Sequence, residues 1–223
     1  MIAALAKALS QLSDPLFRRV IFKTFLWSLS ISIALFLAAT WAVTQIQATE
    51  IGWLDGIIEI LGGGAAFFIA VLLFPGLASI VIGLFMEDIA RAVEALHYPD
   101  LPEPRHQPLR EAIWLAVKLA FIAVILNLLV LPIYLIPVLN IFVFYALNGY
   151  LLGWEYFELA ALRRIDEPDA RQLRRRHRIR VFVVGVIITF LLSIPFVNWF
   201  MPVVAAAFVV HEFEGLRMRA GIA

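Results

Sequence analysis

Two adjacent arginines, Arg18 and Arg19, stand directly before a long apolar run and have the chemistry to hold an anion. Pro15 suits the first turn of a helix, and Asp14 suits the capping position before it. Such a helix presents its free backbone N–H groups at about residues 15–18, at the positive end of its dipole. Two guanidinium groups beside these donors would form a small-oxyanion site, in which the Asp14 carboxylate competes with the anion. The pair also fits a positive-inside topology signal, and both interpretations stay open.

A second set of candidates consists of polar residues inside apolar segments, because a polar side chain in lipid is costly and usually faces protein or water. These residues are Lys23, Lys118, Asn127, Asn140, Asn148, Glu155, Glu158, Asn198, His211, Glu212 and Glu214. Asn148, Glu155 and Glu158 follow one another at spacings of 7 and 3 residues, so one helix would carry them on roughly one face. They either line a polar pathway or contact the arginines of 163–180.

Other chemistry is poorly represented in the chain. The sequence has no cysteine, which excludes disulfides, thiolate metal sites and cysteine nucleophiles. The four histidines are scattered and form no HExxH or paired metal-ligand spacing. No nucleophile elbow is present, and a net charge of +1 gives no basic field for nucleic acid. We therefore expect no enzyme activity, cofactor, metal site or nucleic-acid partner.

The composition identifies the solvent of this chain as lipid. Of its 223 residues, 63% are hydrophobic and 16% are charged, with a mean hydropathy of +0.92. Soluble domains carry about 45–50% apolar and about 25% charged residues. A water-soluble fold of this length could not cover so much apolar surface. The sequence predicts an all-α integral membrane protein with one helical membrane domain over residues 1–223.

The apolar segments predict which elements cross the bilayer. A spanning helix needs about 20 apolar residues, and the segments at about 20–48 and 62–86 satisfy this requirement. Two further apolar regions, at about 112–162 and 181–219, predict helical hairpins. The first arm of the last hairpin, residues 181–194, is about 21 Å long, whereas the hydrocarbon core is about 30 Å thick. This hairpin is therefore expected to be re-entrant, and the one at 112–162 either spans or dips.

Charge placement predicts the orientation. Lysine and arginine gather at 7–23, 91–118, 163–180 and 217–219, while residues 44–59 carry three acids and no base. The positive-inside rule places both termini in the cytoplasm, with both hairpins inserted from that side. The eight arginines of 163–180 predict an orientation signal with lipid headgroup contact, or substrate electrostatics as the alternative.

Three segments carry a family resemblance: "DPLFRRVIFKTFL" at 14–26, "LNGYLLGWEYFELAALRR" at 147–164, and the hairpin that begins "RRRHRIRV" and ends "HEFE" at 174–214. In this organisation the chain resembles the CysZ-type membrane proteins, which are associated with sulfate uptake for cysteine biosynthesis. The family pattern near the N-terminus reads approximately Pro-Gly-Leu-Arg-Arg. It matches Pro15 to Arg19 here, with Leu16 in place of the glycine.

The resemblance implies a sulfate-binding site made by Arg18, Arg19 and the backbone donors of Leu16 and Phe17. It also implies two spanning helices, two membrane-dipping hairpins and a homo-oligomer, in a multi-pass protein of the bacterial inner membrane. The expected function is that of a sulfate transporter or channel for cysteine biosynthesis, with Asn148, Glu155 and Glu158 as pathway lining. The alternative is a non-transporting membrane protein whose inserted hairpins shape the bilayer or recruit partners.

Overall fold

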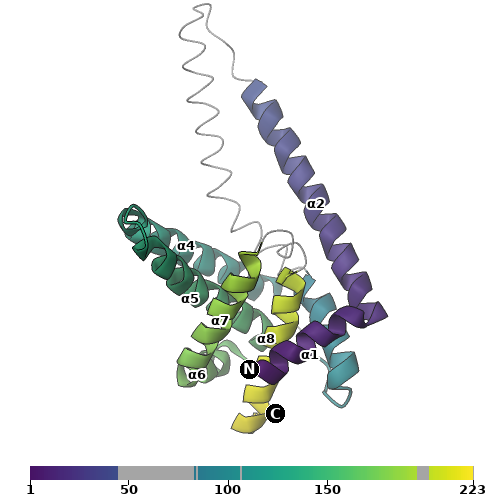
Figure 1. Cartoon of the computed structure of the whole chain (residues 1–223). Coiled ribbons are helices and arrows are strands. Elements are labelled where there is room, and N and C mark those ends of the chain that lie inside the picture. The colour runs from purple at the N-terminus through teal and green to yellow at the C-terminus, as the bar shows by residue number, and fades with distance from the viewer. Residues whose placement is uncertain (45–82, 84, 106, 195–200, 223) are drawn as a thin grey trace, which may run out of the picture.

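The computed structural model of the chain describes residues 1–44, 83, 85–105, 107–194 and 201–222 (Figure 1). Throughout these ranges the regular elements are helices and no strand occurs, which confirms the all-α prediction. The elements are α1 (Ile2–Ser10), the 3₁₀ turn η1 (Gln11–Ser13), α2 (Pro15–Thr44), a helix over residues 85–97, α4 (Leu109–Tyr134), α5 (Leu139–Ala161), α6 (Glu167–Arg176), α7 (Arg178–Leu192) and α8 (Met201–Ala220).

The predicted spans are described only in part. Helix α2 covers 30 residues, about 45 Å, and includes the predicted span from residue 20 to residue 44. The predicted span at 62–86 lies outside the described residues except for its last turn. Among the residues that the structure does describe, one stretch, Arg110–Tyr134, is long and apolar enough to cross a membrane.

Helices α4 and α5 form the hairpin predicted at 112–162. They lie side by side and project from the rest of the chain (Figure 1). Helix α4 begins at Leu109 and continues through Pro132 to Tyr134, so it is longer at both ends than the apolar run alone indicates. The chain then reverses over residues 135–138, where Val138 has a φ of 69°, a left-handed conformation that β-branched residues rarely adopt.

The outer surface of this hairpin is apolar and uncovered. Large side chains such as Phe121, Leu129 and Phe142 are each about two-thirds exposed. Soluble monomers rarely expose contiguous apolar patches of this kind. The surface is that of an element surrounded by lipid or by a partner.

The second hairpin consists of α7 and α8. Helix α7 has 15 residues and is about 22 Å long, which confirms the short first arm expected from the sequence. Helix α8 differs from the expected short return: it continues through His211, Glu212 and Glu214 to Ala220 as a single 20-residue helix. These polar residues are buried in protein, because α8 lies among α1, α5 and α7 and forms the centre of the fold.

Helices α5 and α7 approach one another closely through three glycines. Gly149 and Gly153 form a GxxxG spacing on α5, and Gly185 faces them from α7. A Cβ atom at Gly153 would lie 2.5 Å from the carbonyl oxygen of Val181, and one at Gly185 would overlap the backbone of Gly149. Small residues at such a crossing allow the two backbones into contact, as is common between helices in membranes.

Candidate functional site

The predicted anion site lies where η1 ends and α2 begins. As expected, Asp14 caps this helix: the Phe17 amide donates to Asp14 Oδ1 at 3.0 Å, and the Arg18 amide donates to the Asp14 carbonyl oxygen at 2.9 Å. Proline at position 15 has no N–H. The Leu16 amide is therefore the remaining backbone donor of this turn, and that of Phe17 is shared with the cap.

The two guanidinium groups of this site face solvent. Arg18 and Arg19 are exposed, and neither forms an ion pair within the described part of the chain. Between this turn and the core, Phe17 is buried to 1% exposure and anchors the helix start. The arrangement is a fixed turn that carries two adjacent arginine side chains with unused donor capacity.

The predicted pathway residues all lie on α5, but they differ in environment. Asn148 is half-buried and donates to the carbonyl oxygen of Phe144 in its own helix at 2.9 Å. Glu155 is also half-buried. Glu158 is buried and accepts from Trp154 Nε1 at 3.0 Å and from Arg174 Nε at 3.2 Å. Of the two sequence interpretations, Glu158 therefore follows the one in which the carboxylate contacts the arginine segment.

Other polar candidates hold elements together. Lys23 on α2 forms a 2.6 Å ion pair with Asp88, and Lys118 on α4 forms a 3.3 Å ion pair with Glu167. Glu212 on α8 pairs with Arg180 Nε at 2.7 Å. Asn198 lies outside the described residues.

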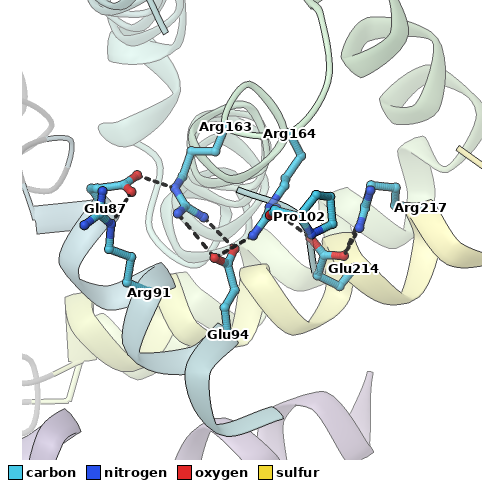
Figure 2. A network of polar contacts seen from close by, with 8 residues as sticks. All are labelled: Glu87, Arg91, Glu94, Pro102, Arg163, Arg164, Glu214 and Arg217. Atoms are coloured by element: carbon cyan, nitrogen blue, oxygen red, sulfur yellow. Dashed lines mark hydrogen bonds and ion pairs between the residues drawn. The ribbon is translucent and has the colours of Figure 1, made fainter. Parts of the chain in front are cut away.

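A buried charge network joins three helical segments (Figure 2). Arg163 and Arg164, which directly follow α5, point toward carboxylates on helix 85–97. Arg163 Nε binds Glu87 at 2.6 Å, and its NH1 binds Glu94 at 2.7 Å. Arg164 NH2 binds the other oxygen of Glu94 at 2.7 Å, so one carboxylate is shared by two consecutive arginines.

The network extends from Arg164 to α8. Arg164 NH1 donates to the carbonyl oxygen of Pro102, and its Nε lies 4.0 Å from Glu214 Oε1. Glu214 in turn accepts from Arg217 at 2.9 and 3.0 Å. The network therefore fixes the loop after helix 85–97, the end of α5 and the end of α8 relative to one another.

Charge is nearly balanced within the network. Its members are four arginines (Arg91, Arg163, Arg164 and Arg217) and three glutamates (Glu87, Glu94 and Glu214). The hydrogen bond from Arg163 lowers the pKa of Glu87 to about 2, against the opposing effect of partial burial. The Glu87 carboxylate is therefore ionised at neutral pH.

This network was not predicted from the sequence. A signal was available, since Glu87, Arg91 and Glu94 are spaced by 4 and 3 residues and share a helix face. In the sequence, Arg163 and Arg164 begin an arginine-rich segment that is typical of a membrane surface, whereas in the folded chain both side chains are buried. Within the described ranges, no group of three or more histidine, aspartate or glutamate side chains could hold a metal ion.

Comparison with known families identifies the family of this chain. Residues 4–202 match the family described as "Sulfate transporter CysZ/Etoposide-induced protein 2.4". The match covers the Arg18–Arg19 turn and most of the charge network, while Glu214 and Arg217 lie beyond it. The chain belongs to this family. Among curated proteins, none matches the chain.

Membership in the CysZ/etoposide-induced protein 2.4 family confirms the resemblance seen in the sequence and makes the chain a membrane protein. The first-named members of the family are transporters and not enzymes, and sulfate is the substrate that their name implies. Of the two arginine pairs described above, Arg163 and Arg164 are already bound by Glu87 and Glu94, whereas Arg18 and Arg19 are exposed and have no ion pair in the described residues.

Proposed function

We propose that the protein carries sulfate, or a closely similar oxyanion, across the inner membrane and supplies it for cysteine biosynthesis. Three features support this proposal: the family match, the uncovered apolar hairpin, and the exposed arginine pair at the start of α2. The arginine pair is the observation that carries the proposal, because it combines positive charge, a helix start and the absence of a paired carboxylate in the described residues.

In this proposal, Arg18 and Arg19 gather the anion and bind it. Guanidinium groups match oxyanions through bidentate charge-assisted hydrogen bonds, and the Leu16 amide adds a backbone donor. The Phe17 amide joins only where the anion displaces the Asp14 carboxylate, to which it donates here at 3.0 Å. Leu16 also stands where the family pattern has glycine, so the bound anion would rest mainly on the two side chains.

The proposed membrane architecture follows from helix lengths. Two helices at about 20–48 and 62–86 span the bilayer, and α7 with α8 forms a hairpin that enters from one face, because α7 is shorter than the roughly 30 Å core. Helices α4 and α5 are long enough either to span or to dip at an angle. A homo-oligomer would enclose the path between copies and cover part of the apolar hairpin.

Asn148 and Glu155 on α5 remain our proposed pathway lining, together with Glu158 at its end. A carboxylate repels sulfate, so Glu158 would act as a gate, with its charge balanced by Arg174 at 3.2 Å. The chain has no nucleotide-binding motif, so the driving force would be a gradient, a coupled ion or the consumption of sulfate in the cell.

The test is sulfate flux into liposomes that contain the purified protein. We expect the double variant R18Q/R19Q to lose about tenfold or more of the flux, because two charge-assisted contacts are removed. The matched control is R110Q/R175Q, which removes two exposed arginines that have no ion pair in the described residues. Undiminished flux in R18Q/R19Q would remove the proposed site.

A second candidate function is supported by one observation, the broad apolar surface of the α4–α5 hairpin. A protein that inserts this hairpin could shape the bilayer or recruit partners without transport. Vesicles that change curvature on incorporation, together with no anion flux in any variant, would favour this candidate over the first.

A further inference from the structure

An open hollow of about 450 Å³ is lined by the end of α6, the start of α7 and the N-terminal Met1. Its lining residues are Met1, Arg176, His177, Arg178, Ile179, Arg180 and Val183. Ligand sites commonly have volumes of about 300–1,000 Å³, so the hollow has the size of a small ligand or a headgroup. The two ends of the arginine segment 163–180 therefore lie in different places: Arg163 and Arg164 are buried in the charge network, and residues 176–180 line this hollow.

Positive charge in the hollow exceeds what the protein itself neutralises. Arg180 is held by Glu212 at 2.7 Å. Arg176 and Arg178 are exposed and form no ion pair within the described ranges. Burial lowers the pKa of His177, and the charges of Arg176, Arg180 and Arg219 lower it further. Arg219 on α8 therefore adds to the positive charge near the hollow. Arg176 and Arg178 are thus free to bind an anion, and the positive charge of the neighbouring arginines favours such binding.

One wall of the same hollow is apolar. Ile179 is 72% exposed, and Val183, one turn further along α7, is 37% exposed. Phe182 beside them is exposed to the same extent as Val183, and α7 continues as an apolar helix to Leu192. The hollow therefore has positive side chains at one end and an apolar helix face that leads away from them. This arrangement matches a molecule that has a phosphate at one end and hydrocarbon at the other.

We propose that this hollow binds an anionic phospholipid, with its phosphate held by Arg176 and Arg178 and its acyl chains lying along Ile179 and Val183. A free oxyanion shares the phosphate chemistry, but it would leave the apolar wall uncovered. The position also suits a lipid, because the hollow lies at the base of the hairpin, where α7 leaves the polar surface and becomes apolar. The site does not depend on what the protein transports.

The experiment uses the full chain in mild detergent, titrated with short-chain phosphatidylglycerol and followed by native mass spectrometry. Matched titrations use phosphatidylcholine of the same chain length, inorganic phosphate and sulfate. We expect phosphatidylglycerol to bind the wild-type protein. R176Q/R178Q should lower the affinity for phosphatidylglycerol about tenfold or more, because charge-assisted contacts are lost. The control R110Q/R175Q should change the affinity less than twofold, and I179N should weaken phosphatidylglycerol but not phosphate.

Two results would overturn the proposal. Phosphatidylglycerol binding that is unchanged in R176Q/R178Q places the lipid elsewhere. Phosphate or sulfate that binds as tightly as phosphatidylglycerol, with no effect of I179N, makes the hollow a site for free oxyanions. A wild-type measurement guards against poor folding of the variants: phosphatidylglycerol, and not phosphatidylcholine, should raise the pKa of His177 by NMR, because a bound phosphate offsets the nearby arginines.

Discussion

Two Arg-Arg pairs of the chain, Arg18–Arg19 near the start of α2 and Arg163–Arg164 just after α5, lie in opposite environments. The second pair is enclosed, and Glu87 and Glu94 bind it at 2.6–2.7 Å. The first pair is exposed and has no ion pair in the described residues. A guanidinium that leaves water needs carboxylate partners, whereas one that stays in water keeps its donors for a ligand. The buried pair therefore has a structural role, and the exposed pair keeps its donors for the anion binding that we propose.

The buried pair should give the largest loss of stability. Arg163→Met removes the ion pairs to Glu87 and Glu94, so that Glu94 keeps Arg164 and the partly exposed Glu87 keeps Arg91 as its remaining partner. Breaking a buried ion pair costs about 3–5 kcal/mol when a charge is left unpaired, and the remaining partners place the expected loss at the low end, about 3 kcal/mol. Chemical unfolding of the purified protein in detergent, followed by circular dichroism, measures the change.

A matched double variant sharpens this result. Replacing Arg163 and Glu87 together by apolar residues of similar volume should be less destabilising than Arg163→Met alone, because Glu94 keeps Arg164 at 2.7 Å and the released Arg91 is exposed to solvent. A double variant as unstable as the sum of the two single variants would show that the pair does not couple.

The next largest loss of stability is expected where α5 and α7 cross. Gly185→Ala places a methyl group against the backbone of Gly149 and Gly153, and backbone cannot move aside as a flexible side chain can. Overpacking of this kind costs about 1–3 kcal/mol. The control is Gly215→Ala on α8, where nothing lies within 4 Å of the added atom. That substitution should be neutral or stabilising by about 1 kcal/mol in the same unfolding assay, because alanine favours a helix interior.

Acid should weaken the network through Glu87. Its pKa is lowered from an ordinary value of 4.5 to about 2, first of all by the hydrogen bond from Arg163. The stabilisation is therefore complete above pH 4.5 and is lost as the pH falls toward about 2. In unfolding curves collected from pH 7 downward, Glu87→Gln should be less stable than wild type at neutral pH and should converge with it in acid. A constant difference at every pH would contradict the assignment.

The sequence predicted those features of the structure that depend on one segment of the chain alone. The composition predicted helices in lipid, the length of the run at 181–194 predicted the short α7, and Asp14-Pro15 predicted the capped start of α2. It was less informative where distant segments meet. Arg163 and Arg164 read as surface charge until Glu87 and Glu94 are placed opposite them, more than 60 residues away in the chain. His211, Glu212 and Glu214 read as the end of the apolar arm, but α8 continues through them because protein, not lipid, surrounds them.

The smallest effect on stability is expected at the exposed pair, and it separates binding from folding. R18Q/R19Q removes two charges from a turn whose hydrogen bonds come from backbone amides and Asp14, and whose buried anchor is Phe17. Surface substitutions away from buried features usually change stability by less than about 0.5 kcal/mol. Unfolding of this variant should therefore overlay that of wild type, while its sulfate flux falls. Flux and stability that fall together would give this pair the structural role of Arg163 and Arg164. Flux lost from a protein of wild-type stability would leave anion binding as the role of the arginines at the start of α2.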